Sequence, residues 1–254
     1  MAPRRIVVFV IIFALILIAA YVSTALNINP PPKKVRPLGE FYLRHSYFGN
    51  YTAKSPEVVT SIVWDYRGLD TLFEVTVFFL AIMGGLTIFR LEKKKTVEQQ
   101  VSGGMTLIVK LASKILSVLI VAVSASIALH GHLTPGGGFQ GGTALAIAPL
   151  LIIAAYSRYA LEKHGLTYLK AVVIRSTSLL FLWIVVVLPL LNGYYLMQNQ
   201  PFYPSRFYNQ LISGSLFYYN LLDYIAIGMG FTAIFLYLSI PEEIYKEELE
   251  AEMK

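Results

Sequence analysis

The sequence predicts an all-α, polytopic membrane protein with about six transmembrane helices and one interfacial helix in the first outer loop. Of its 254 residues, 56% are hydrophobic and 14% are charged, and the mean hydropathy is +0.61. Soluble domains carry about 25% charged residues. Six apolar runs approach or exceed the roughly 20 residues that cross the hydrocarbon core of a bilayer. The chain therefore faces lipid or other apolar helices along most of its length.

The chain contains no cysteine. We therefore expect no disulfide, iron–sulfur cluster or thiolate metal site on it, and no metal centre of its own. The formal net charge is +6, and the basic residues are spread over the segments between apolar runs. This distribution indicates membrane topology and excludes a nucleic-acid footprint.

The first apolar run covers residues 6–26 and follows Arg4 and Arg5. A basic flank before an apolar core is also typical of a signal peptide. Because the run continues to Leu26, we interpret it as the first membrane helix, with the amino terminus in the cytoplasm.

Residues 27–67 form a polar, aromatic-rich segment outside the membrane, after three prolines at 30–32. Ser55, Pro56 and Glu57 are typical of a helix start, with Ser as the cap and Pro at the first position. The apolar residues that follow would give a short interfacial helix one apolar face; they are Val58, Val59, Ile62 and Val63.

The second span is expected to run to about Leu91, and residues 65–74 lead into it with the sequence DYRGLDTLFE. Two interpretations of Glu74 stay open. Thr71 and Glu74 have the spacing of a capping box, which satisfies free backbone N–H groups. An acid one turn inside a span is also a candidate for an ion pathway. Asp70 is a second candidate of this kind in the same motif.

The third span follows a basic linker at residues 90–100 and covers residues 105–129. Lys110 and Lys114 lie one helical turn apart, on one face. Lys110 is close enough to the cytoplasmic end to extend to the interface. Lys114 either does the same or faces a partner carboxylate or a hydrated cavity, because a lysine facing lipid near mid-membrane costs roughly 3 kcal/mol.

Residues 130–142, HGHLTPGGGFQGG, separate the third span from a fourth that ends near Tyr156. The link is too short for a domain, so the two helices are expected to form a tight hairpin. We expect Pro135 to end the first helix, and glycines to permit the reversal and a close helix contact. The predicted hairpin glycines are Gly136, Gly137, Gly138, Gly141 and Gly142.

His130 and His132 in this link have two open interpretations. The first is a packed turn with no chemistry. The second is a proton relay at the membrane surface, since histidine titrates near neutral pH. Their spacing suits two metal ligands poorly, and no cysteine or nearby carboxylate completes a zinc site.

The fifth and sixth spans are expected at residues 169–191 and 216–240, joined by an aromatic-rich outer loop. Asp223 lies in the sixth span. It is either an interfacial acid that accepts a hydrogen bond or an intramembrane partner for a lysine or a cation. With the amino terminus inside, twelve Lys and Arg residues fall on the cytoplasmic side and seven outside. This bias predicts that both termini are cytoplasmic.

The motif at residues 130–142 resembles the signature of the B subunit of Mrp-type multisubunit sodium/proton antiporters, and of related subunits in membrane-bound hydrogenases and sulfane reductases. This resemblance covers roughly residues 96–241. The motif at residues 65–74 resembles the carboxyl-terminal segment of the antiporter A subunit, over roughly residues 1–92. Phe73 departs from the small residue of that pattern. The resemblances imply a fusion, with a two-helix unit at 1–95 and a four-helix unit at 96–254.

The resemblance implies a subunit of a complex that exchanges sodium ions for protons, in the cell membrane. The large part of the A subunit is missing here, which favours the antiporter module of a membrane-bound hydrogenase or a sulfur-reducing respiratory complex. Iron–sulfur clusters and a nickel–iron centre would then sit on partner subunits in a peripheral redox arm. We expect Glu74 to be the first protonatable group, and the resemblance at residues 65–74 strengthens that expectation. Lys114 is the second candidate, and His130 and His132 are the third.

Three alternatives stay open. The chain could belong to a stand-alone Mrp-type antiporter, act as an independent small-solute carrier, or serve as a structural spacer. An enzyme should show a convergent nucleophile, base and orienting group, and we find no such set in the sequence.

Overall fold

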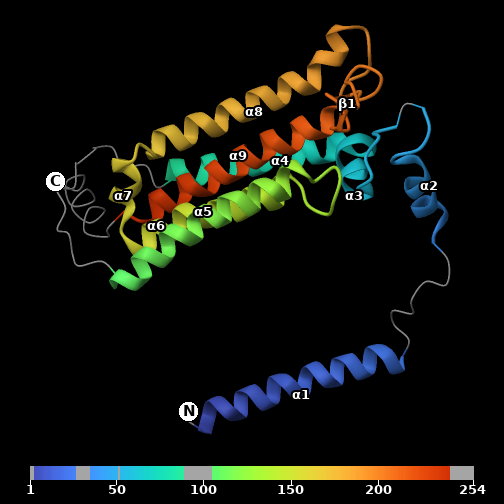
Figure 1. The fold of residues 1–254 in the computed structure, drawn as a ribbon. Coiled ribbons are helices and arrows are strands. Elements are labelled where there is room, and N and C mark those ends of the chain that lie inside the picture. The colour runs from blue at the N-terminus through green and yellow to red at the C-terminus, as the bar shows by residue number, and fades with distance from the viewer. Residues whose placement is uncertain (1–2, 27–34, 51, 89–104, 241–254) are drawn as a thin grey trace. The chain divides into compact units, whose positions relative to one another are not determined.

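The computed structural model describes residues 3–26, 35–50, 52–88 and 105–240 (Figure 1). The chain divides into two compact units, residues 1–41 and 42–254. The first unit contains helix α1, Pro3–Ala25, whose described apolar part is Phe9–Ala25. Pro3 stands at its first position, where the missing N–H costs nothing. Helix α2, Pro37–His45, spans the boundary between the two units.

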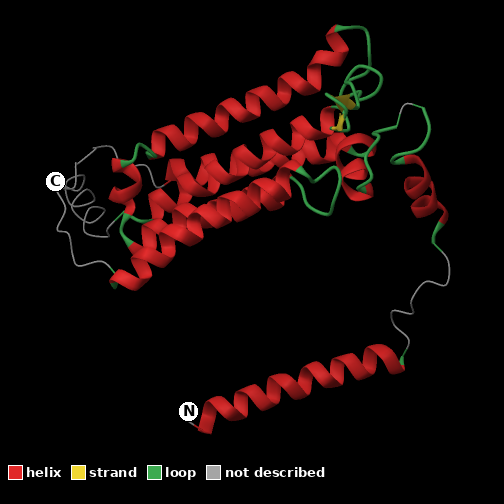
Figure 2. Cartoon of the chain, viewed as in Figure 1, coloured by secondary structure: helices red, strands yellow, loops and turns green. Residues whose placement is uncertain are grey.

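Among the residues that the structure describes, the second unit contains five helices that are long and apolar enough to cross a membrane. They are α4 (Gly68–Ile88), α5 (Leu107–Leu129), α6 (Gly138–Ala155), α8 (Tyr168–Leu191) and α9 (Ser215–Leu238). With α1, all six predicted apolar runs are helical, so the prediction of an all-α, polytopic membrane protein is confirmed. The described strands are the two-residue β1 (Arg206–Phe207) and β2 (Gln210–Leu211), which pair antiparallel in the loop before α9 (Figure 2).

Helix α9 is the centre of this bundle. It packs against α4, α5, α6 and α8, and half of its apolar window is buried, against 11% for α5. Trp64 stacks on Tyr219 of α9 at 4.7 Å between ring centroids, within a cluster that also includes Leu182 and Leu216. The apolar faces of α5 and α4 that this chain leaves uncovered are the surfaces expected for lipid or partner helices.

Helices α5 and α6 form the predicted hairpin, and glycines let α6 approach two helices at once. A methyl group at Gly141 would lie 2.8 Å from Ala128 of α5. A methyl group at Gly142 would lie 2.7 Å from Ile227 of α9. The predicted close contact is therefore present, and the partner of Gly142 is α9.

The prediction that Pro135 ends the first helix of the hairpin is wrong. Helix α5 ends at Leu129, and His130 is its C-cap. The backbone N–H groups of Leu133 and Thr134 donate to the carbonyl of His130, which closes a separate turn before the proline. The reversal itself falls at the glycines, as expected, with Gly137 at φ +151°.

The predicted start of the interfacial helix is also wrong. Helix α3, Val58–Ser61, has Glu57 as its N-cap, and the Glu57 carboxylate accepts from the N–H of Thr60. Ser55 instead donates its hydroxyl to the carbonyl of His132 at 2.7 Å. The segment continues as a π-helical turn, η1, Ile62–Tyr66.

The buried face of this segment also differs from the predicted one. Val59 is 62% exposed, whereas Thr60, Ser61 and Trp64 are buried. The reason is that the turn at residues 130–137 presents backbone carbonyls to this face, and Thr60 donates its hydroxyl to Gly131.

A short helix, α7 (Arg158–Lys163), joins α6 to α8, and Arg158 pairs with Glu162 at 2.5 Å. Several predictions fall outside the described residues: the prolines at 30–32, the linker at 90–100, Pro241 and the tail at 242–254. The proposed junction of two evolutionary units near residue 95 stays a prediction.

Candidate functional site

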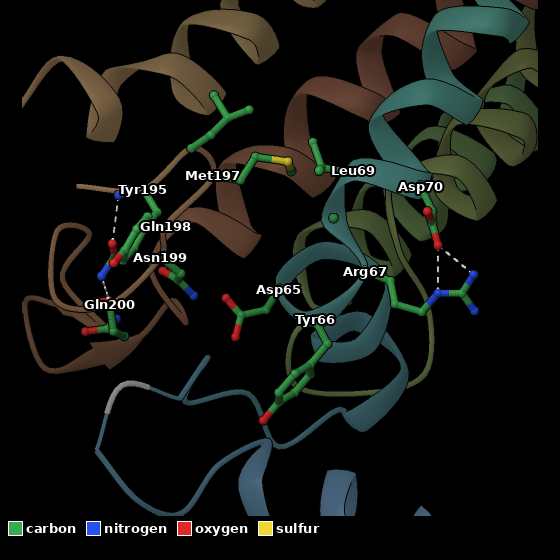
Figure 3. Close-up of a pocket in the computed structure, with 12 residues that line it drawn as sticks. Asp65, Tyr66, Arg67, Leu69, Asp70, Tyr195, Met197, Gln198, Asn199 and Gln200 are labelled. Atoms are coloured by element: carbon green, nitrogen blue, oxygen red, sulfur yellow. Dashed lines mark hydrogen bonds and ion pairs between the residues drawn. The ribbon is translucent and has the colours of Figure 1, made fainter. Parts of the chain in front are cut away.

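The motif at residues 65–74 lines a cavity of about 530 Å³ between the start of α4 and the loop that follows α8. Figure 3 shows Asp65 in the space between Tyr66 and Asn199, with Arg67 and Asp70 paired away from it. The lining is mostly polar. It includes Asp65, Tyr66, Arg67, Asp70, Gln198, Asn199 and Gln200.

Asp65 is the carboxylate of this cavity with a perturbed titration. Burial raises its pKa from 3.8 to about 6, because desolvation disfavours the charged form. Burial also raises the pKa of Tyr66, and the charge of Asp65 adds to that shift. Asp65 belongs to the motif at residues 65–74 but is not among the predicted site residues. Its partial burial in η1, which the sequence does not reveal, distinguishes it from the exposed Asp70.

Asp70 forms an exposed ion pair with Arg67. Its carboxylate lies 2.5 Å from one guanidinium nitrogen and 2.7 Å from Nε of Arg67, and its side chain is 62% exposed. Exposed pairs of this kind contribute about 0–1 kcal/mol to stability. Asp70 therefore lies at the rim of the cavity, and its role in an ion pathway stays a proposal.

The capping-box interpretation of Glu74 is wrong. Helix α4 begins at Gly68, so Thr71 lies inside its first turn, and the Thr71 hydroxyl donates to the carbonyl of Val63 at 2.6 Å. Glu74 is exposed on α4, on a face shared with Val77, which is 63% exposed. The ion-path interpretation of Glu74, an acid on an otherwise apolar helix face, stays a proposal.

Asp223 is buried at the amino-terminal end of α6. It is 3% exposed, and its Oδ2 lies 2.9 Å from the position that a Cβ of Gly138 would occupy. Asn220, one turn earlier on α9, accepts a hydrogen bond from the N–H of Gly138 at 3.3 Å. The positive end of α6 thus faces the carboxylate. Oδ1 of Asp223 has no hydrogen-bond partner among the described residues.

Glu74 and Asp223 stand on neighbouring helices, since α4 packs against α9. Asp223 is close enough to Glu74 to feel its charge.

The structure separates the two histidines. His132 is 3% exposed, and its Nε2 donates to the carbonyl of Leu211 at 2.9 Å. Its Nδ1 is buried without a partner among the described residues, and burial lowers the pKa of the ring. His130 is exposed, with Nδ1 3.0 Å from the carbonyl oxygen of Ser126. His132 is thus held as a neutral ring against the loop before α9.

Lys114 and Lys110 share one face of α5, as predicted. Their amino groups lie 5.4 and 5.6 Å from the centroid of the Tyr156 ring, and the Tyr156 hydroxyl donates to the Lys110 carbonyl at 2.9 Å. Lys114 is exposed. This pair lies at the opposite end of α5 from His130, so the structure does not bring it together with Glu74 and Asp223.

Arg175 of α8 is a site residue that sequence reasoning missed. It is 1% exposed, its guanidinium lies 4.6 Å from the Phe79 ring centroid, and it donates to the carbonyl of Phe78 at 3.4 Å. Its second terminal nitrogen has no partner among the described residues. The sequence does contain a signal for this residue, since an arginine inside an apolar run is a functional candidate. In predicting the topology we count Arg175 only among the twelve cytoplasmic Lys and Arg residues.

In the described part of the chain, no three His, Asp or Glu side chains gather in a way that could hold a metal ion. The candidate site is a set of protonatable and hydrogen-bonding groups along α4 and α9. Such a set can hold and pass protons, or guide a cation past two carboxylates.

Comparison with protein families matches residues 108–233 to a domain related to the MnhB subunit of Na⁺/H⁺ antiporters. This span contains the hairpin motif, α5, α6, α8 and most of α9. The resemblance to an antiporter B subunit is thereby confirmed for this part of the chain.

One curated relative is an uncharacterized protein of Methanocaldococcus jannaschii, MJ1307, which is 33% identical over 134 residues. The aligned part is 47% of this chain and 48% of that protein, so the chain spans about half the length of the relative it matches.

Two solved structures share the fold. A chain of the membrane-bound sulfane sulfur reductase, an archaeal respiratory membrane complex, matches with a TM-score of 0.69 and 26% identity. That match covers 92% of this chain and 98% of the other. A chain of the Mrp complex from Dietzia sp. DQ12-45-1b matches with a TM-score of 0.62 and 19% identity, over 95% of this chain and 26% of that one.

Proposed function

We propose that this chain is a membrane subunit of the sodium/proton antiporter module of a multisubunit respiratory complex, of the membrane-bound hydrogenase or sulfane reductase type. The observation that carries the proposal is the full-length match to one chain of the sulfane sulfur reductase complex. The MnhB-related domain at residues 108–233 supports the same assignment.

The coverage of the two matched chains favours the respiratory complex over a stand-alone antiporter. The reductase match covers 92% of this chain and 98% of the other, so the two chains align over nearly their whole extent. The matched chain of the Mrp complex is covered over only 26% of its length, so in that complex the same fold is part of a much larger chain.

The proposed ion path uses the carboxylates of α4 and α9. Glu74 is the first group to take up a proton or meet a sodium ion, because it is exposed on an apolar helix face and acts on the buried Asp223. Asp70 would collect cations at the outer rim, and His132 would hold the neighbouring turn. Lys114 and His130 lie on the exposed surface, where they would meet partner subunits.

The chain itself would supply no redox chemistry. With no cysteine, it would depend on a peripheral arm of partner subunits that carry iron–sulfur clusters and a nickel–iron centre, while sodium ions and protons are the transported species. Other antiporter-like membrane subunits would cover the free faces of α4 and α5. Both termini are proposed to lie on the cytoplasmic side.

The test is to purify the chain from its native membrane in mild detergent and to identify the subunits that accompany it. Antiporter subunits together with iron–sulfur subunits would support the respiratory complex. Antiporter subunits without redox subunits would favour a stand-alone Mrp-type exchanger, the second candidate, which the Mrp fold match supports. A chain that purifies alone and moves a solute or ions in vesicles would overturn both.

A further inference from the structure

Two ammonium groups converge on one aromatic ring where α5 begins and α6 ends. The amino groups of Lys110 and Lys114 lie 5.6 and 5.4 Å from the centroid of the Tyr156 ring. Lys114 is exposed and Lys110 is half-buried. A ring face attracts a cation only weakly at an exposed site, so it does not neutralise two of them. The two lysines and Tyr156, here called the lysine cluster, therefore present two positive charges close together on the surface.

No described carboxylate balances these two charges. Helices α5, α6 and α7 contain a single acid, Glu162, and it already pairs with Arg158 at 2.5 Å. Neither lysine of the cluster forms an ion pair within the part of the chain that the structure describes. Helix α7 adds a further cation, Lys163. This end of the α5–α6 hairpin thus has a net positive charge.

Tyr156 indicates the depth of the lysine cluster in the membrane. Its hydroxyl donates to the Lys110 carbonyl at 2.9 Å, so the ring lies beside the first turn of α5. Lys114 stands seven residues beyond Leu107, the first residue of α5, or about 10 Å along the helix axis. Its side chain nevertheless reaches back to the same ring. Tyrosines are enriched at the level of the lipid headgroups, and lysines extend to that level. The two charges therefore lie among the headgroups.

Apolar side chains continue the same face of α5 toward the middle of the bilayer. Leu111 and Val118, three residues before and four after Lys114, are 52% and 70% exposed. Among the long apolar helices of the described residues, α5 is also the one that this chain buries least. A surface with cations at headgroup level and exposed apolar side chains below them matches the two ends of a single phospholipid.

We propose that the lysine cluster binds the phosphate of an anionic membrane lipid, whose acyl chains lie along α5. Basic pockets between membrane helices bind anionic headgroups. The ammonium groups of Lys110 and Lys114 donate hydrogen bonds to the phosphate oxygens. A zwitterionic lipid carries a cation of its own, which the lysines repel, so the site selects a lipid with net negative charge. The inference does not depend on the proposed ion path. The lipid would lie between α5 and the subunits proposed to cover it.

A carboxylate on a partner helix fits the geometry less well. To meet it within the bilayer, Lys114 would extend sideways from α5 and away from Lys110. Here both amino groups gather on the Tyr156 ring at the end of the hairpin. One anion at headgroup level, with more than one charged oxygen, can serve both lysines. The phosphate group of a lipid has these properties.

The test is native mass spectrometry of the purified complex, titrated with phosphatidylglycerol and, separately, with phosphatidylcholine. A double variant, Lys110→Met with Lys114→Met, should bind phosphatidylglycerol at this site about 30-fold more weakly, since each lysine near the membrane surface contributes about fivefold. Phosphatidylcholine should bind to the wild type and the double variant alike.

The matched control is a second double variant, Lys163→Met with Lys170→Met. It removes the same number of positive charges from the same end of the bundle, on α7 and α8. It should retain phosphatidylglycerol as the wild type does. Equal loss in both double variants would show that only the overall charge of this surface matters, and would contradict a site at the lysine cluster.

Three other results would overturn the proposal. The first is equal retention of phosphatidylglycerol by the wild type and by the variant that lacks Lys110 and Lys114. The second is a site in the wild type that inorganic phosphate alone saturates, with no lipid retained. The third is the loss of a neighbouring subunit from that variant without a change in lipid retention, which would assign the lysines to a partner carboxylate.

Should the variant of the lysine cluster fail to assemble, cryo-electron microscopy of the wild-type complex decides. Headgroup density between the amino groups of Lys110 and Lys114, continuous with acyl-chain density along α5, would support the site. A protein side chain or solvent at that position would contradict it. Lipid retention and transport are separate readouts, so the proposed function can fail while the lipid site stands.

Discussion

Gly138, the first residue of α6, lies against Asp223 of α9 so closely that a methyl group on it would stand 2.7 Å from the Asp223 Cβ. The same methyl group would stand 2.5 Å from the carbonyl oxygen of Asn220. A glycine at this position therefore lets the positive end of one helix meet the buried carboxylate of another.

Gly138→Ala should lower stability, because helix backbones must separate to admit the methyl group. Overpacking of this kind typically costs about 1–3 kcal/mol. Thermal unfolding of the purified chain in detergent measures the effect. Gly84→Ala is the control, since among the described residues no atom beyond its chain neighbours and its own helix backbone lies within 4 Å of its Cβ position. Alanine also favours a helix interior. Equal melting temperatures for the two variants would show that the close contact is not energetically important.

An arginine buried inside an apolar span is a candidate for the ion path. Arg175→Met should therefore abolish ion transport by the complex while leaving the melting temperature of the chain unchanged or higher. The guanidinium is buried with one nitrogen unpartnered in the described residues, and an apolar side chain of similar volume avoids that desolvation cost. Lys170→Met, an exposed cation on the same helix, should keep transport. Loss of stability together with transport would mean that Arg175 serves only the packing of α8.

Asp65 should make stability depend on pH between 3.8, its ordinary pKa, and about 6, its pKa in the folded chain. In that window the folded chain holds a proton that the unfolded chain releases, so stability rises as the pH falls through it. Above pH 6 the charged, buried carboxylate of Asp65 lowers the stability of the folded chain. Asp65→Asn should therefore raise the melting temperature at pH 7.5 and leave it nearly unchanged below pH 4. Asp70→Asn, at the exposed ion pair, controls for the loss of a carboxylate.

His132 should make stability depend on pH in the opposite direction. Burial lowers the pKa of its ring below 6.5, so the unfolded chain binds a proton before the folded chain does, and stability falls as the pH drops below 6.5. His132→Gln should remove this loss, which melting curves between pH 5 and 8 would show. His130→Gln, at an exposed ring, should keep the wild-type pH dependence; if it removes the dependence instead, the assignment to His132 fails.

The apolar runs predicted every long helix, because length and hydropathy alone decide which segments can enter a bilayer. The sequence could not place Asp223 beside Gly138. That contact depends on α9 packing between α4 and α6, and a uniformly apolar helix gives no sign of which face meets which neighbour. Thr71 shows that sequence spacing also fails to decide a hydrogen-bond partner over a short stretch of chain. Its spacing to Glu74 fits a capping box, but the carbonyl of Val63 in η1 takes its hydroxyl instead.

The most direct test of the proposed ion path is sodium-dependent proton movement in inverted membrane vesicles that contain the complex with Glu74→Gln. This variant should assemble with its partners and lose most of the exchange, because glutamine keeps the shape of Glu74 but cannot carry a proton. Glu162→Gln, at the surface ion pair of α7, should exchange like the wild type. Full exchange by an assembled Glu74→Gln complex would contradict the claim that the ion path crosses this chain.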